Sequence, residues 1–292
     1  MKIDSKNFCI SSGKKLQLSS WPTEVDTFYK SKNDCKEKLQ KSVERLDELQ
    51  NKLYASGKQS VLIIFQAMDA AGKDSIIRHT LTGLNPQGIE VHSFKTPSQT
   101  ELKHDFLWRT TQCLPEKGKI GVFNRSYYEE VLIVKVHPQF LAAQSVELPK
   151  NQGSFWKERY QSINDFEKHL CRNGTHILKF HLHLSKEEQA RRFLSRIDEP
   201  AKNWKFNTAD VEEREYWDAY QSAYQDCIQA TSTPHAPWYI IPADDKWNAR
   251  LIVSRILLEK AEKINPCYPH LKPEHVKEMK RLRQILVKQV KD

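Results

Sequence analysis

Residues 67–74 have the residue types and the spacing needed to bind phosphate. They read AMDAAGKD and come close to the GxxxxGK[ST] pattern of phosphate-binding loops. In such a loop, inward-pointing backbone N–H groups and the start of the following helix attract the anion, while the lysine reaches its outer phosphates. We therefore expect phosphate to be bound by Ala70, Ala71, Gly72, Lys73 and Asp74, with Lys73 as a catalytic cation.

The loop departs from this pattern at three positions. Ala67 stands where the first glycine is expected, Asp74 replaces the Ser or Thr that helps to hold Mg²⁺, and Asp69 places a carboxylate inside the cradle. A carboxylate repels a polyanion unless a divalent cation lies between them, so Asp69 is expected to be a metal ligand. The alternative is an ordinary strand-to-helix turn with a solvated lysine. The apolar run before the loop and the helical pattern after it favour the phosphate site.

Residues 185–206 form a basic segment that could close over the phosphate loop. Arg192 and Arg196 are four residues apart on a predicted helix, with Arg191 beside them, and Lys202 and Lys205 follow the helix-breaking Asp198-Glu199-Pro200. One interpretation is a solvated helix face followed by a loop. Beside a phosphate loop, the cations favour a lid, because arginine offers several planar donors to phosphoryl oxygens.

Alternating strands and helices must position these residues. Strands are predicted over 61–65, 88–94, 119–123, 176–184 and 238–242. Helices are predicted over 23–56 (one long helix or a broken pair), 74–80, 101–114, 126–136, 156–171, 207–231 and 246–263. A further helix starts at Ser185, with Glu188 completing a capping box. This alternation predicts an α/β fold in which helices cover both faces of a parallel sheet. Ligands bind beyond the carboxyl ends of such strands, which here are followed by residues 69–73, Lys95 and residues 124–125.

Composition narrows the class of protein without deciding its partner. The 292 residues are 39% hydrophobic and carry a net charge of +9, which suits an anionic ligand such as polyphosphate, nucleic acid or an acidic membrane. No apolar stretch is long enough to span a membrane, and the N-terminus lacks a signal peptide's apolar core. The six cysteines are scattered along the sequence, which is typical of reduced thiols in a cytoplasmic protein. Because no stretch could span a membrane, we also expect that the protein binds no membrane.

Four blocks of sequence resemble the polyphosphate kinases of family 2. They are AMDAAGKD at 67–74, FNRSYYE at 123–129, EQARRFLSRIDEPAKNWKF at 188–206 and APWYIIPADDKWNARL at 236–251. The resemblance implies a P-loop kinase-like fold and Mg²⁺-assisted (or Mn²⁺-assisted) phosphoryl transfer between inorganic polyphosphate and adenine nucleotides, with guanine nucleotides left open. It also implies a homo-oligomer, either a dimer or a tetramer.

The resemblance also assigns roles to individual residues. The catalytic group would be Asp69, Lys73, Arg125 and Arg192, with Arg191 and Arg196 as alternative lid arginines. Further phosphate contacts would come from Lys95, Lys202 and Lys205, and nucleotide contacts from Arg78, Asp105, Arg109, Asn124 and Glu129. Arg78 and Arg109 could equally be surface cations. Asn124 stands where the family's single-domain enzymes usually carry Asp, which shifts the metal role to Asp69. The sequences of residues 85–109 and 124–138 resemble those of the subgroup that accepts both AMP and ADP.

The chain is expected to be one domain, residues 1–292. An N-terminal arm and helix (1–56) precede a core (57–265) that includes the lid at about 185–206, and a basic helix (266–292) follows.

Two other functions would use the same features. A conventional ATP-dependent nucleoside or nucleotide kinase would have similar loop chemistry, although Asp69 and Asp74 disfavour it. A nucleic-acid-binding protein could use the basic tail 275–291, but apolar residues at helical spacing (Val276, Leu282, Leu286 and Val290) make that tail more typical of a packing or oligomer-forming helix. We therefore expect no nucleic-acid partner.

Overall fold

One parallel sheet organises the molecule. The computed structural model of the chain describes residues 3–13, 15–147 and 150–290. Its five strands lie in the order β2-β3-β1-β4-β5. They are β1 Ser60–Gln66, β2 Ile89–Ser93, β3 Ile120–Asn124, β4 Thr175–His183 and β5 Trp238–Pro242. The predicted α/β fold is confirmed, because every predicted strand is present and no end has moved by more than one residue.

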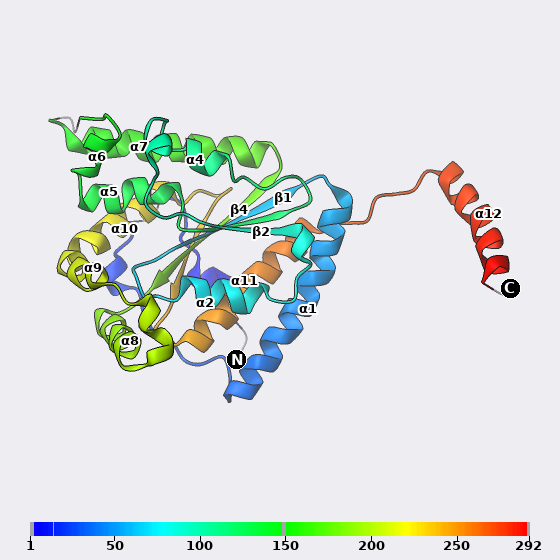
Figure 1. The fold of residues 1–292 in the computed structure, drawn as a ribbon, viewed down its shortest axis with the longest axis horizontal. Coiled ribbons are helices and arrows are strands. Elements are labelled where there is room, and N and C mark those ends of the chain that lie inside the picture. Colours follow the sequence, from blue (N-terminus) through cyan, green and yellow to red (C-terminus); the bar gives the residue numbers. More distant parts are fainter. Residues whose placement is uncertain (1–2, 14, 148–149, 291–292) are drawn as a thin grey trace.

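Long helices cover both faces of the sheet (Figure 1). One face packs against α1 (Lys32–Ser56), α2 (Lys73–Leu81) and α11 (Lys246–Ile264), and the other against α7 (Gln152–Arg172) and α10 (Trp217–Thr231). Successive β1 side chains alternate between these two cores, with Ile63 and Phe65 in the first and Leu62 and Ile64 in the second. This explains why β1 reads as an unbroken apolar run.

The remaining elements are short, apart from the lid helix and the last helix. They are α3 Gln99–Leu102, α4 Trp108–Thr111, α5 Ile133–Val136, α6 Phe140–Ala143, α8 Lys186–Asp198, α9 Thr208–Glu212 and α12 Pro273–Gln289, with 3₁₀ turns η1 Ser5–Phe8, η2 Leu18–Ser20, η3 Pro86–Gly88, η4 Tyr127–Val131, η5 Pro200–Lys205 and η6 Glu213–Tyr216. Among the helices of the described residues, none is long and apolar enough to cross a bilayer.

Five helix predictions were wrong in extent, and in three of them a side chain that accepts from a backbone N–H fixes where a helix starts. The helix expected over 156–171 begins earlier, at Gln152, where the Asn151 side chain accepts from the Ser154 N–H. The helix expected over 23–56 begins at Lys32, where the Ser31 side chain accepts from the Asp34 N–H. The helix expected over 101–114 is divided into α3 and α4, because the Asp105 carboxylate accepts from the Leu107 N–H and starts a new turn. Residues 126–136 form η4 and α5, and residues 207–231 become one long helix only from Trp217.

The lid helix has only half of the predicted capping box. The Ser185 hydroxyl accepts from the Glu188 N–H at 3.0 Å, as expected. The Glu188 carboxylate does not return the bond, because it pairs instead with Arg191 and Arg192, each at 2.9 Å.

The N-terminal arm is irregular, as predicted, and packs on the core. The Leu16 and Leu18 N–H groups donate to the side chains of Gln229 and Gln225 on α10, and both leucines are buried. The arm prediction over residues 1–22 includes residues 1–2 and 14, and the tail prediction includes residue 291; these lie outside the described residues.

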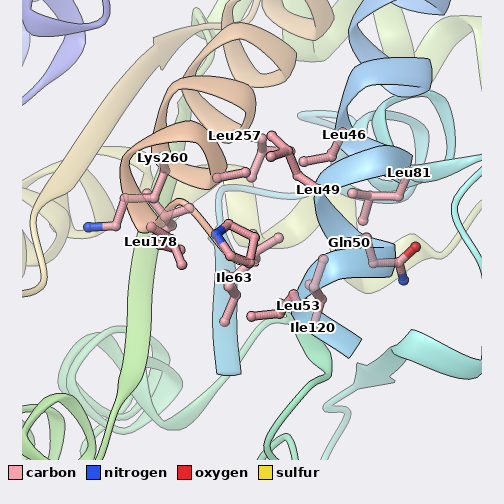
Figure 2. A pocket seen from close by; sticks show the side chains of 14 residues that line it. Leu46, Leu49, Gln50, Leu53, Ile63, Leu81, Ile120, Leu178, Leu257 and Lys260 are labelled. Carbon is pink, nitrogen blue, oxygen red and sulfur yellow. The ribbon is translucent and has the colours of Figure 1, made fainter. Parts of the chain in front are cut away.

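A small apolar cavity of about 30 Å³ lies between α1, α11 and the sheet (Figure 2). Val61, Ile63 and Ile120, which line it, stand near the starts of β1 and β3, away from the carboxyl ends of the strands. Its lining is almost entirely apolar, and therefore we assign it to the core.

Candidate active site

The phosphate loop connects β1 to α2 through two left-handed residues. Ala70 has φ 62° and Gly72 has φ 103°, and α2 begins at Lys73. The Lys73 side chain is only 9% exposed, and its Nζ donates to the Ala67 carbonyl at 2.8 Å. Burial lowers the pKa of Lys73, and the neighbouring Asp69 carboxylate opposes this shift. The Lys73 side chain therefore lies inside the loop in which phosphate is predicted to bind.

The three predicted strand ends meet at one cleft. Because β2, β3 and β1 are neighbours in the sheet, the segments that follow them line the same cleft of about 670 Å³. The predicted residues lining it are Asp69, Ala70, Gly72, Lys73, Asp74, Lys95, Asn124, Arg125, Arg192, Arg196, Lys202 and Lys205. The Asn124 amide donates to the Asp74 carboxylate across the cleft floor.

Asp69 and Arg125 form an ion pair at the centre of the site. An Arg125 N–H donates to Asp69 Oδ1 at 2.8 Å, and both side chains are about one-third exposed. Burial raises the pKa of Asp69, but the charges of Lys73, Arg125 and Arg196 lower it by more, so the net shift is downward. Asp69 is thus ionised at neutral pH and only weakly basic, which suits a cation ligand better than a general base.

Arg125 is held in an unusual backbone conformation. Its φ is +64°, and its N–H donates to the Phe65 carbonyl at 3.0 Å. Burial alone would lower the pKa of Arg125, whereas Glu129 and Asp69 raise it above its usual range. Burial raises the pKa of the half-buried Glu129, although Arg125 and Lys73 counteract this. Arg125 is therefore a fixed positive charge beside the loop.

The lid brings four of its predicted cations to the cleft, and Arg192 is the one of the four that is buried. Arg196, on α8, donates to the Asp210 carboxylate at 3.0 Å and to the Lys205 carbonyl at 3.2 Å. Lys202 donates to Ser195 and Glu199, and Lys205 is exposed. Arg196 is therefore the predicted lid arginine that lines the cleft and is not buried.

Arg192 lies beneath the phosphate loop with all five of its N–H groups engaged. Nε donates to Glu188, Nη1 to the Ala70 and Ala71 carbonyls, and Nη2 to the Ala243 and Asp244 carbonyls, at 2.6–3.1 Å. The side chain is only 6% exposed. A guanidinium with no free donor holds the backbone in place, so we assign Arg192 a positioning role in place of the catalytic role expected from the sequence.

Replacing Arg192 with lysine should loosen the loop while keeping the positive charge. An ammonium has three donors and cannot reproduce the planar fork that spans four carbonyls. We expect kcat/KM to fall about 30-fold, because loop geometry governs positioning of the phosphate. Steady-state kinetics would check this, with the exposed Arg191→Lys as the matched control; equal, near-normal rates for both variants would contradict it.

Six other predicted residues lie away from the cleft lining, although two of them, Arg109 and Glu129, line the apolar pocket described below. Arg191, Arg78 and Asp105 are exposed, Ala71 is buried below the loop, and Arg109 is buried with its Nη1 donating to the Lys95 carbonyl at 2.7 Å. Exposure of Arg78 agrees with the alternative interpretation of a surface cation. Arg109 instead supports the strand end that carries Lys95 and lies 5.5 Å from the Phe94 ring centroid.

Two cleft cations at the start of α11 were missed. Lys246 and Arg250 line the cleft, and Arg250 Nη2 donates to the Ser75 hydroxyl at 2.8 Å. Both follow β5, so the strand-end rule, if applied to the fifth strand, would have found them. Asp210, the partner of Arg196, carries no comparable signal because it lies on the short α9 helix.

An apolar pocket of about 190 Å³ adjoins the cleft. Phe94, Ile133, Val134 and Phe140 form much of its wall. It shares Lys95, Thr96 and Arg125 with the cleft, and Glu129 also lines it. The apolar pocket and the cation-lined cleft are therefore contiguous at these shared residues.

A phosphate loop after a central parallel strand, with a cationic lid across the cleft, defines a P-loop phosphotransferase. Residues 29–268 match the family model described as Polyphosphate kinase 2 (PPK2). The chain therefore belongs to the polyphosphate kinase 2 family, and the predicted resemblance is confirmed.

Relatives along the full length agree with this assignment. The chain is 59% identical over 289 residues to an ADP-polyphosphate phosphotransferase of Rhodopseudomonas palustris, covering 99% of this chain and all of that protein. It is 45% identical over 265 residues to an AMP/ADP-polyphosphate phosphotransferase of Meiothermus ruber, covering 90% and 95%. The crystal structure of polyphosphate kinase 2 from Arthrobacter aurescens TC1 matches with a TM-score of 0.85 and 38% identity, over 95% of each chain.

Proposed function

We propose that this protein transfers phosphoryl groups between inorganic polyphosphate and AMP or ADP. The observation that carries the proposal is the union of two sites, a cation-lined cleft for phosphate chains and an apolar pocket for a base, which meet at Lys95 and Arg125. The names of the Rhodopseudomonas and Meiothermus relatives support the same reaction.

The residues favour catalysis by positioning and charge neutralisation. The acceptor oxygen of AMP or ADP is already anionic, so no general base is needed. The main barrier is bringing two polyanions into line, and Lys73, Arg125 and Arg196 supply positive charge on different sides of the cleft. The ionised, Arg125-bound Asp69 is consistent with this mechanism, because a carboxylate whose pKa is lowered is a weak base.

A divalent cation, Mg²⁺ or Mn²⁺, would be held at Asp69. Arg125 occupies one carboxylate oxygen of Asp69, which leaves the other for a cation. Within the described parts of the chain, no group of three or more His, Cys, Asp or Glu side chains could hold a metal unaided. Mg²⁺ is commonly bound by one or two carboxylates together with substrate phosphates and water, so this site fits it. When bound, the ion would reduce the negative charge of the phosphates.

Phosphoryl transfer from defined donors tests this function. Purified protein would be given long-chain polyphosphate and Mg²⁺ with either AMP or ADP, and products would be separated by nucleotide chromatography. We expect polyphosphate-dependent ADP and ATP from AMP, and ATP from ADP. Product from ADP alone would restrict the acceptor. Transfer from ATP to AMP without transfer from polyphosphate would establish the conventional kinase instead.

Phe140→Ala should weaken binding of the acceptor base. Phe140 lines the apolar pocket and remains 44% exposed, so truncation removes ring contact without opening the core. We expect the KM for AMP to rise about tenfold with the KM for polyphosphate unchanged. Tyr54→Ala, equally exposed on α1, is the matched control. Equal increases in both KM values would place the base elsewhere.

We also propose that the chain forms a homo-oligomer. Helix α12 extends away from the body (Figure 1), and no residue in it is buried. Its exposed apolar side chains include Met279, Leu282 and Leu286. Most helical stability in proteins comes from packing an amphipathic face, and no such packing buries a residue of α12, which supports an oligomer-forming role. Sedimentation at micromolar concentration would distinguish monomer from dimer or tetramer.

A further inference from the structure

A fully buried ion pair lies behind the turn that carries Arg125. Lys179 on β4 and Glu167 on α7 have no exposed surface, and Nζ lies 2.6 Å from Oε2. Lys179 also donates to the Tyr128 hydroxyl at 2.9 Å and to the Thr231 carbonyl at 2.8 Å. All three ammonium protons therefore have an acceptor, as a buried charge requires.

The second oxygen of Glu167 binds the two tyrosines of the turn. Oε1 accepts from the Tyr127 hydroxyl at 2.9 Å and from the Tyr128 hydroxyl at 2.8 Å. Both rings are completely buried, and burial raises the pKa of each hydroxyl well above its usual value, so both remain donors. The hydroxyls of Tyr127 and Tyr128 are thus bound to an ion pair that links helix α7 to strand β4.

The same two tyrosines lie between groups that face the substrate cavities. Arg125 precedes them with a φ of +64°, a left-handed conformation that is strained for a non-glycine residue. Glu129 follows them and lines the apolar pocket with Arg125. Such a conformation persists only where the surroundings hold it, and the Tyr128 N–H to Ser126 Oγ bond is local to the turn itself. The Arg125 N–H to Phe65 carbonyl bond attaches the start of the turn to β1, and the ion pair attaches the two tyrosines that follow.

We propose that Glu167 and Lys179 are positioning residues that, through Tyr127 and Tyr128, fix the turn and thereby aim the Arg125 guanidinium at phosphate. Neither residue lines the cleft, and the tyrosine hydroxyls connect both of them to the turn that carries Arg125. The inference rests on the proposed function only for its kinetic readout.

A double-mutant cycle between Glu167 and Arg125 tests the proposal. Glu167→Gln keeps the shape but removes the charge that holds Lys179 and both hydroxyls. We expect it to lower kcat about 30-fold in the otherwise unaltered protein but less than about threefold in an Arg125→Lys background, because its effect depends on the guanidinium. Equal losses in the two backgrounds would show that Glu167 acts independently of Arg125 and would overturn the proposal.

Milder variants separate positioning from general destabilisation. Tyr128→Phe keeps the buried ring and removes only the hydroxyl, and should lower kcat about tenfold. Leu53→Ala, a buried α1 residue in the core on the other face of the sheet, is the control for loss of Tm. If Glu167→Gln and Tyr128→Phe lower Tm as Leu53→Ala does, with kcat unchanged in all three, the ion pair is merely structural.

A binding measurement keeps this test independent of the proposed reaction. Calorimetric titration with tripolyphosphate should show about a tenfold loss of affinity for Glu167→Gln and little further loss when Arg125→Lys is added. Absence of transfer in the unaltered protein would reject the proposed function, while the binding cycle would still decide the role of the ion pair. Unchanged affinity in Glu167→Gln would reject that role.

Discussion

Replacing Lys73 with alanine should lower kcat for transfer from polyphosphate about 1,000-fold, equivalent to about 4 kcal/mol of transition-state stabilisation. The lysine begins α2 inside the phosphate loop, where its ammonium can turn from the Ala67 carbonyl to a phosphoryl oxygen. No other cleft cation starts from within the loop, so the remaining arginines cannot replace it.

The Lys73→Ala protein should stay folded. The side chain forms no buried ion pair, and removing a largely buried ammonium also removes its desolvation penalty. Rapid-quench transfer assays would measure the rate, and thermal unfolding the stability. Lys36→Ala, at an exposed position of α1, is the matched control. Turnover of Lys73→Ala within tenfold of the unaltered rate would remove Lys73 from the mechanism.

Asp69→Asn should lower kcat by a similar factor, about 1,000-fold, for a different reason. The carboxylate holds Arg125 at 2.8 Å and provides the free oxygen expected to bind the divalent cation. The amide has no charge, so the Arg125 position and the cation affinity should both suffer. Rates measured across a range of Mg²⁺ concentrations should show half-saturation at a higher concentration than in the unaltered protein.

The magnesium dependence distinguishes the two roles of Asp69. A lower kcat with unchanged half-saturation would assign Asp69 to positioning Arg125 alone, and near-normal turnover would remove it from the site. Asp218→Asn, on the exposed surface of α10, is the control and should behave like the unaltered protein.

Several site residues could not be placed from the sequence because their roles depend on burial. Arg192 and Arg196 are four residues apart on one helix and look equivalent in the pattern. In the fold, the first half of α8 packs against the phosphate loop, so Arg192 is 6% exposed and bound to carbonyls while Arg196 faces the cleft. Helical spacing predicts that the two arginines share one face of the helix. It does not predict which part of that face the neighbouring backbone covers.

The sequence by itself determined the sheet, the phosphate loop and the strand ends that meet in the cleft. These features are local, since an apolar run, its flanking turns and the eight loop residues are contiguous in the chain. Tertiary structure alone decided the Asp69–Arg125 pair, the clamp made by Arg192 and the Glu167–Lys179 anchor. Each joins residues on separate elements, and only packing brings their charges within hydrogen-bonding distance and removes the water that would otherwise screen them.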